Sequence, residues 1–188
     1  MIPVNIVVGR FQPLTMGHLK CAEEARRQTG LPTVLCMIET PLNKLDSKHP
    51  FPSTLTLPLY MRLLKDHKDI IGIVLVKNAD IVKISEKLRE MGWQIGSWTC
   101  GTDRARDYRR IMDSYRDKAN LVPGAGVIEV SRPEGAISAT AVREMIKTGD
   151  LEGFLEQTPW GRTIKGRSRA SQDFELLSKW INRLERRD

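Results

Sequence analysis

Residues 2–18 have the sequence IPVNIVVGRFQPLTMGH, and this stretch determines how the rest of the chain is interpreted. The run Ile2–Val8 is nearly continuous in Val and Ile, which is typical of a parallel strand buried on both faces. Gly9 follows it and lets the backbone approach a ligand closely. Pro13 stiffens the turn, and Gly17 stands where a helical pattern begins. The segment therefore predicts a strand, an anion-binding loop and a helix whose N-terminal N–H groups attract phosphate.

The same alternation continues along the chain. Four further strand patterns occur at Thr33–Ile38, Ile70–Val76, Ile95–Cys100 and Gly126–Val130. Helical patterns lie between the strands at His18–Gln28, Leu55–Asp66, Ile81–Met91 and Arg104–Tyr115. Strands that alternate with helices predict an α/β fold: a doubly wound, Rossmann-like, five-stranded parallel sheet with helices on both faces.

The last third of the chain predicts a C-terminal helical extension. A helix at Ser138–Thr148 and a short helix at Leu151–Glu156 precede a Gly/Arg-rich joint, Gly161–Arg169. An amphipathic helix then covers Ser171–Arg186. We expect one main domain over residues 1–160. The basic joint and last helix, residues 161–188, should pack on or near it.

Composition restricts the class of protein. The net charge is +7, and residues 161–188 hold eight Lys or Arg against four Asp or Glu, which supplies +4 of it. A basic tail is usually a solvated face, so charge alone does not predict nucleic-acid binding. No apolar run approaches the roughly 20 residues of a membrane span, and Ile2–Val8 lacks the basic flank of a signal peptide. Three widely spaced cysteines suggest reduced thiols, so we expect a cytoplasmic protein without a membrane partner.

The loop and helix start carry candidate chemistry. Thr15 and His18 are three residues apart across the first helical turn, so both side chains can point towards one phosphate. Together with Gly17 they resemble the T/H-x-G-H signature of the nucleotidyltransferase superfamily related to class I aminoacyl-tRNA synthetases. The preceding Gly9–Pro13 resembles the opening of archaeal-type nicotinamide mononucleotide (NMN) adenylyltransferases. Thr in the first position is similar to the pantetheine-phosphate adenylyltransferases.

A second motif follows the fifth predicted strand. Residues 137–143, ISATAVR, resemble the I-S-x-T-x-x-R motif of the same superfamily. Ser138 is suited to cap the helix, Thr140 and the first amides to face an anion, and Arg143 to clamp phosphate with its planar guanidinium. The resemblance covers roughly residues 1–160. The string Gly101-Thr102-Asp103-Arg104 is also similar to nucleotidyltransferase-like proteins of tailed phages.

The resemblance implies roles for individual residues. It makes His18, Thr15 and Arg143 the catalytic group. It assigns ATP binding to Gly9, Arg10, Phe11, Gln12, Gly17, Ser138 and Thr140. It assigns acceptor binding to Lys48, Arg62, Gly101, Thr102 and Asp103, and Trp98 is a further acceptor-binding candidate because of its aromatic ring. Trp93 or Trp98 could stack on a nicotinamide or adenine ring or simply pack in the core, and Asp103 also suits a helix cap. The loop Pro41–Ser53 fits a mobile substrate loop and an ordinary surface connection equally well.

The implied reaction transfers AMP from ATP to NMN, with Mg²⁺ arriving on the ATP and no protein metal site. ATP and a small phosphorylated acceptor are the expected partners, and a homo-oligomer is compatible with the sequence. The acceptor could also be phosphopantetheine, flavin mononucleotide or an alcohol phosphate, the last with CTP as donor. From a different class, the chain could be a non-catalytic nucleotide- or nucleic-acid-binding protein that uses the fold as a scaffold.

Overall fold

The computed structural model describes residues 1–131 and 137–186, which form two compact units. The first unit contains residues 1–9, 20–38 and 67–131, and the second contains residues 10–19, 39–66 and 137–186. Within these residues, no helix combines the length and the apolar character needed to cross a membrane. The predicted domain boundary at residue 160 stays a prediction.

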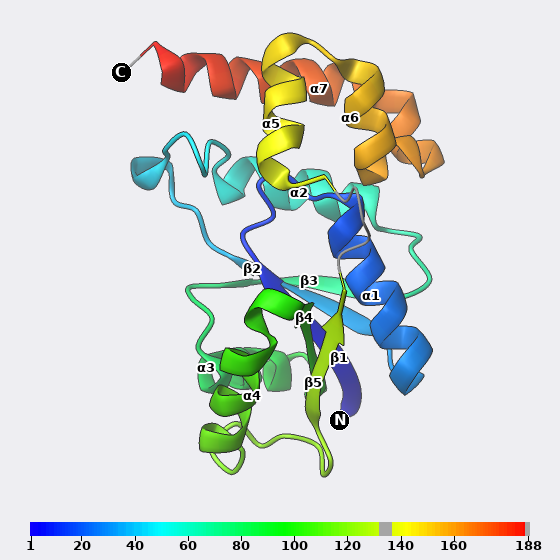
Figure 1. Cartoon of the computed structure of the whole chain (residues 1–188), viewed down its shortest axis with the longest axis vertical. Coiled ribbons are helices and arrows are strands. Elements are labelled where there is room, and N and C mark those ends of the chain that lie inside the picture. The colour runs from blue at the N-terminus through cyan, green and yellow to red at the C-terminus, as the bar shows by residue number, and fades with distance from the viewer. Residues whose placement is uncertain (132–136, 187–188) are drawn as a thin grey trace. The chain divides into compact units, whose positions relative to one another are not determined.

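The first unit is built on a five-stranded sheet whose neighbouring strands are all parallel (Figure 1). Its strands are β1 (Ile2–Gly9), β2 (Thr33–Ile38), β3 (Ile70–Val76), β4 (Trp93–Gly101) and β5 (Gly126–Val130). They are arranged in the order β3-β2-β1-β4-β5. The chain therefore winds outward from β1 in one direction and then continues from β4 on the other side of β1. This confirms the predicted Rossmann-like fold.

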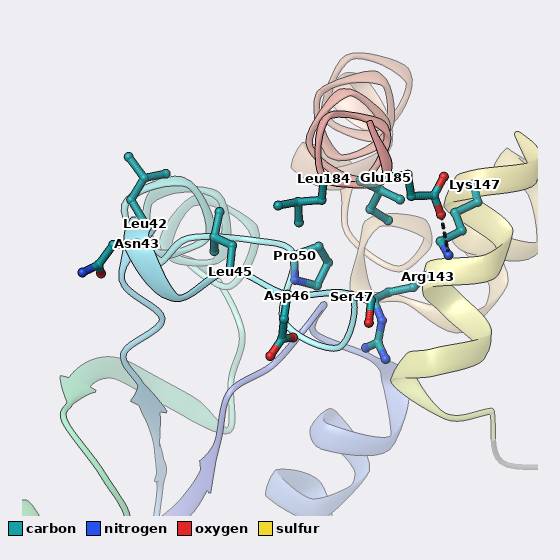
Figure 2. Close-up of a pocket in the computed structure, with 11 residues that line it drawn as sticks. Leu42, Asn43, Leu45, Asp46, Ser47, Pro50, Arg143, Lys147, Leu184 and Glu185 are labelled. Carbon is teal, nitrogen blue, oxygen red and sulfur yellow. Dashed lines mark ion pairs between the residues drawn. The ribbon is translucent and has the colours of Figure 1, made fainter. Parts of the chain in front are cut away.

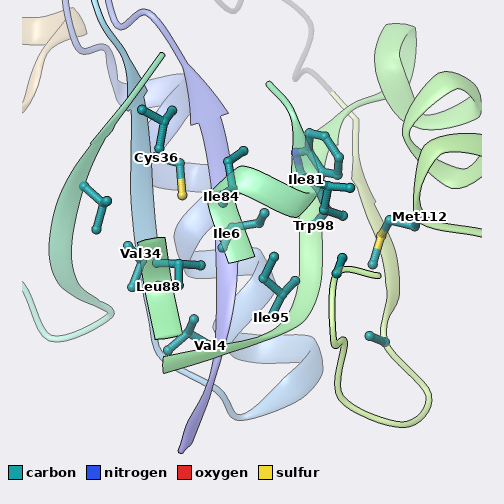
Figure 3. Packing of buried hydrophobic residues seen from close by; sticks show 14 residues of the cluster. Val4, Ile6, Val34, Cys36, Ile81, Ile84, Leu88, Ile95, Trp98 and Met112 are labelled. Carbon is teal, nitrogen blue, oxygen red and sulfur yellow. The ribbon is translucent and has the colours of Figure 1, made fainter. Parts of the chain in front are cut away.

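Alternation along β1 explains why helices cover both faces. Val4 and Ile6 lie in one hydrophobic cluster with Ile81, Ile84 and Leu88, the apolar face of α3 (Ile81–Glu90) (Figure 3). The helix α4 (Thr102–Tyr115) adds Met112 to the same cluster. The intervening Asn5 must point to the opposite face. There its amide nitrogen donates to Thr29 Oγ1 at 2.9 Å, at the end of α1 (Met16–Thr29).

The second unit is helical and has an aromatic core. It contains α2 (Ser53–Leu63), α5 (Ala139–Thr148), α6 (Leu151–Gln157) and α7 (Ile164–Glu185). Two short 3-10 turns, η1 (Leu42–Lys44) and η2 (Pro159–Gly161), complete it. The fully buried Trp160 packs against Tyr60 of α2 and Phe154 of α6, with ring centroids 6.1 and 5.0 Å away. These contacts hold α2 beside the C-terminal helices.

One sequence expectation about this unit is wrong. The Gly/Arg-rich stretch Gly161–Arg169 is not a joint, because α7 begins at Ile164 and runs without a break to Glu185. Thr163 caps this helix by accepting a hydrogen bond from the N–H of Gly166 at 2.9 Å. A Cβ at Gly166 would lie 2.6 Å from the carbonyl oxygen of Trp160. The glycine therefore permits close packing of the helix rather than a flexible hinge.

Candidate active site

The loop that precedes α1 is held in an uncommon backbone conformation. Phe11 has φ of 50°, a value that non-glycine residues rarely adopt. The hydroxyl of the buried Tyr60 donates to the carbonyl oxygen of Phe11 at 2.6 Å and accepts from the N–H of Leu14 at 3.1 Å. One phenol thus joins both ends of the turn. Burial raises the pKa of Tyr60, so the hydroxyl keeps the proton that it donates.

Gln12 fixes the same loop to the segment before α2. Its amide nitrogen donates to the carbonyl oxygen of Phe51 at 2.7 Å, and its amide oxygen accepts from the N–H of Phe51 at 3.0 Å. Gln12 is 5% exposed and Phe51 is fully buried. A glutamine that satisfies both backbone groups of one residue positions the chain. The side-chain amide therefore ties the loop to the segment before α2.

His18 is oriented by Thr15. The backbone N–H of Thr15 donates to Nδ1 of His18 at 3.0 Å, and Oγ1 of Thr15 lies 3.0 Å from the same nitrogen. A backbone N–H can only donate, so Nδ1 must be the acceptor. The neutral imidazole then carries its proton on Nε2, the nitrogen that can donate to an anion. The Phe11 ring contacts the imidazole edge-to-face at a centroid distance of 4.9 Å and limits its rotation.

The second motif begins α5 as expected. Ser138 is the N-cap, and its side chain accepts from the N–H of Ala141 at 3.2 Å. Arg143 donates from one guanidinium nitrogen to the carbonyl oxygen of Gln12 at 2.6 Å and from the other to Thr140 Oγ1 at 3.0 Å. Arg143 is 8% exposed, and burial lowers its pKa, although an arginine keeps its charge at any physiological pH. The two motifs therefore meet through this guanidinium.

Within the second unit, the motif residues line a cleft of about 500 Å³. Its lining includes these previously predicted residues: Arg10, Phe11, Gln12, His18, Lys48, Thr140 and Arg143. Lys147, Ser47, His49, Ala139 and Glu144 complete it. Four of these side chains are Lys or Arg, whereas Glu144 is the only carboxylate among the described lining residues. Such a surface attracts polyanions.

The structure does not bring every predicted residue to this cleft. Arg62 instead pairs with Asp173 of α7, whose carboxylate also accepts from Nε1 of Trp160 at 2.8 Å. Asp173 is 2% exposed, so the pair is part of the packing between α2 and α7. Thr15, Gly17 and Ser138 are also not among the lining residues. Thr15 is 5% exposed, whereas Gly17 lies in the first turn of α1 and Ser138 is the N-cap of α5.

The remaining predicted residues belong to the first unit. Trp98 is fully buried and stacks on Tyr108 with ring centroids 3.9 Å apart, as expected for a core residue. Gly101 is the N-cap of α4, and Asp103 lies in its first turn, so the cap is the glycine rather than the aspartate. Arg109 and Thr102 both hydrogen-bond the carboxylate of Glu129. These contacts lower the pKa of Glu129, and Arg109 has the larger effect. Gly9 ends β1, directly before Arg10.

Sequence reasoning missed three contributors to the cleft and its support. Tyr60 gives no sequence signal, because its partners lie 46 and 49 positions away. His49 lines the cleft beside Lys48, and its Nδ1 lies 3.1 Å from Oδ1 of Asp46. Lys147 follows Arg143 by four residues on α5. That spacing alone indicated that the two side chains share a helix face.

Comparison with known proteins gives a consistent result. Residues 6–145 match the sequence model of a family described as cytidylyltransferase-like. Among curated proteins, none matches the chain. The Plasmodium falciparum nicotinic acid mononucleotide adenylyltransferase complexed with NaAD has a similar structure, with a TM-score of 0.57 at 10% identity. The same enzyme complexed with APC gives a TM-score of 0.53 at 11% identity. Both comparisons cover 93% of this chain and 98% of the other, and they establish a shared fold.

Proposed function

Since the chain belongs to the cytidylyltransferase-like family of nucleotidyltransferases, we propose that it transfers AMP from ATP to nicotinamide mononucleotide, forming NAD and pyrophosphate. The observation that carries this proposal is the convergence of His18 and Arg143 on one cationic cleft. His18 presents a proton donor there, and Arg143 joins the two motifs around it. A proton donor and a guanidinium group at one cleft suit the negatively charged oxygens of a triphosphate.

The reaction needs no protein nucleophile. A phosphate oxygen of the acceptor attacks the α-phosphorus, and the new O–P bond forms as the bond between the α-phosphorus and its bridging oxygen breaks. Pyrophosphate leaves with the electron pair of that bond. Catalysis then depends on positioning and on stabilising the negative charge that develops on the leaving group.

Four cleft residues, together with Thr15 beside His18, have separate tasks in this scheme. Nε2–H of His18 donates to an α- or β-phosphate oxygen as charge builds up there. Arg143 and Arg10 neutralise the departing pyrophosphate. Thr15 holds His18 in the donating tautomer, which adds a positioning role to the α-phosphate contact implied by the resemblance. Lys48, which lines the same cleft, binds the acceptor phosphate in this proposal.

Magnesium belongs to the proposal as a companion of the triphosphate. Within residues 1–131 and 137–186, no group of three or more His, Cys, Asp or Glu side chains is placed to hold a metal ion. A Mg²⁺ ion coordinated mainly by phosphate oxygens and water fits such a cleft better than one in a protein cage. When bound, the ion would offset the charge of the phosphates, while His18 and Arg143 orient them.

Nicotinamide mononucleotide is the first acceptor to test for two reasons. Gly9–Pro13 resembles the corresponding subfamily, and the structural neighbours named above act on a pyridine mononucleotide according to their description. Nicotinic acid mononucleotide is therefore the closest chemical alternative. Phosphopantetheine, flavin mononucleotide and alcohol phosphates require the same cleft chemistry, so only substrate tests separate them.

A substrate panel tests the proposal. Pyrophosphate release is measured with ATP or CTP and each acceptor in turn, with Mg²⁺ present, and the products are identified by mass spectrometry. The expected result is NAD formation from ATP and nicotinamide mononucleotide at the highest kcat/KM of the panel. Faster transfer to another acceptor would overturn the substrate assignment, and no pyrophosphate from any pair would overturn the proposed activity.

A further inference from the structure

Lys147 connects the phosphate cleft with a second hollow. It lies one helical turn beyond Arg143 on α5 and lines the 500 Å³ cleft together with it. Both residues also line a smaller cavity of about 210 Å³. Figure 2 shows this cavity between the segment 42–50 and the end of α7, with Lys147 and Arg143 at one side. Lys147 is therefore placed at the boundary of two spaces.

The ammonium group of Lys147 is held on the side of α7. Its Nζ lies 2.8 Å from Oε1 of Glu185, the last residue of α7 (Figure 2). The same Nζ lies 3.8 Å from Oε2 of Glu144. The hydrogen bond with Glu185 raises the pKa of Lys147, so the group is a full cation at neutral pH. The side chains of Lys147 and Glu185 are 32% and 53% exposed. An ion pair with this much exposure contributes little free energy, so Lys147 can leave Glu185 at low cost.

The surroundings distinguish the two sides of Lys147. Leu45, Pro50, Ile181 and Leu184 contribute the apolar part of the smaller cavity, where Glu185 is the partner of the ammonium group. Among the residues that the structure describes, the larger cleft presents three further cations, Arg10, Lys48 and Arg143, against the single carboxylate of Glu144. Repulsion from these cations favours the Glu185 side while the cleft holds no anion. A polyphosphate in the cleft reverses this preference, because it carries more charge than one carboxylate.

The spacing of cleft-lining residues along α5 would let Lys147 move from Glu185 to a bound polyphosphate. Thr140, Arg143 and Lys147 all line the cleft, and seven residues of helix span about 10 Å. The three side chains form a column of donors that starts at the helix N-terminus. Arg143 is fixed by its bonds to Gln12 and Thr140, whereas Lys147 has a long flexible stem. The column can therefore follow a phosphate chain beyond the reach of Arg143.

We propose that Lys147 binds the pyrophosphate portion of the triphosphate and that Glu185, at the end of the C-terminal helix, competes for it. The inference rests on the proposed function and assigns α7 a part in it: the helix supplies the carboxylate that Lys147 leaves when substrate binds. Glu185 thereby weakens binding of the nucleotide and of the pyrophosphate product, which favours product release.

Inorganic pyrophosphate is the probe that tests this assignment without any acceptor. Its affinity for the full chain is measured by isothermal titration calorimetry for the wild type, Glu185→Gln, Lys147→Gln and the double variant. Glu185→Gln should bind about two- to fivefold more tightly, because a competing surface ion pair is removed. Lys147→Gln should bind about tenfold more weakly, because a charged donor is lost. In the Lys147→Gln background, Glu185→Gln should have no further effect.

The matched control is Glu175→Gln. Glu175 lies on the same helix and pairs with Lys179 at 2.7 Å, so the substitution changes the net charge identically without touching the cleft. It should leave pyrophosphate affinity unchanged. Equal gains from Glu175→Gln and Glu185→Gln, wild-type affinity in Lys147→Gln, or no pyrophosphate binding by the wild type would each overturn the assignment. If the affinities change as expected but the substrate panel yields no transfer, the proposed function fails and the Lys147 assignment stands.

Discussion

Arg143 donates a hydrogen bond to the carbonyl oxygen of Gln12 at 2.6 Å, although 131 positions separate the two residues in the chain. The same guanidinium reaches Thr140 one turn earlier on its own helix. Its planar set of donors lets it hold the loop and still face the cleft, which a point charge cannot do. This contact makes one site out of two distant motifs.

Arg143→Lys should therefore be damaging despite conserving charge. An ammonium group cannot bond Gln12 and Thr140 in the same fork geometry, so we expect kcat/KM to fall about 10²-fold. Loss of the buried bond to Gln12 should lower the free energy of unfolding by about 1–3 kcal/mol. Steady-state kinetics and urea denaturation measure the two effects. Arg169→Lys, an exposed change on α7, is the control and should alter neither quantity.

His18→Ala should reduce kcat about 10²–10³-fold, because it removes a donor aimed at the charge that develops in the transition state. The side chain is half-buried, so the protein should remain folded with a similar melting temperature. His67→Ala is the matched control. Nδ1 of His67 also accepts a backbone N–H, from Asp69 at 3.2 Å, but His67 belongs to the first unit and does not line the cleft. A fully active His18→Ala enzyme would refute the catalytic assignment.

Tyr60→Phe should loosen the loop that carries His18. The change leaves the carbonyl of Phe11 and the N–H of Leu14 without their shared partner, at a cost of about 1–3 kcal/mol in the free energy of unfolding. Because the ring stays in place, kcat should fall through misplacement of His18 rather than through global unfolding. Tyr115→Phe, at a 44% exposed position, should stay within about 0.5 kcal/mol of the wild type. Equal stability of the two variants would show that other contacts fix the loop.

Asp173→Asn separates the structural role of Arg62 from the acceptor role implied by the family resemblance. It should lower the free energy of unfolding by about 2–3 kcal/mol, less than for a fully buried pair because the Arg62 side chain is 30% exposed. The KM for the acceptor should not change if Arg62 only packs α2 against α7. Arg62→Ala should give the same pattern in denaturation and kinetics. An increase in acceptor KM in Arg62→Ala alone would restore the acceptor role.

Cys36 should make the protein sensitive to alkali. Burial raises the pKa of its thiol from an ordinary 9.0 to about 12. The folded state thus keeps a proton that the unfolded chain loses above pH 9, so stability is intact below pH 9 and falls as pH rises towards 12. The expected slope is about 1.4 kcal/mol per pH unit from this thiol. Urea denaturation at pH 8 and pH 10 should show a smaller loss in Cys36→Ala, whereas an identical loss would assign the sensitivity to other groups.

Much of the first unit follows from local sequence. The predicted bounds of β2, β3 and β5 agree with the structure, and β1 and β4 differ by at most two residues at either end. Apolar runs of Val and Ile mark strands that are buried on both faces, and this burial acts on each strand separately. The N-cap role of Ser138 could be predicted for the same reason, because a cap depends only on residues within one helical turn.

The sequence by itself determined the reaction-class motifs, Thr15–His18 and Ile137–Arg143, and the alternation that produces a parallel sheet. Only the tertiary structure decided which acceptor each donor side chain uses: Gln12 for Arg143, Phe11 for Tyr60, Asp173 for Arg62 and Glu185 for Lys147. The reason is physical. Helix and strand periods act over a few residues, whereas a buried polar group must find its partner wherever packing places one. Partner choice therefore depends on segments that are far apart in the chain.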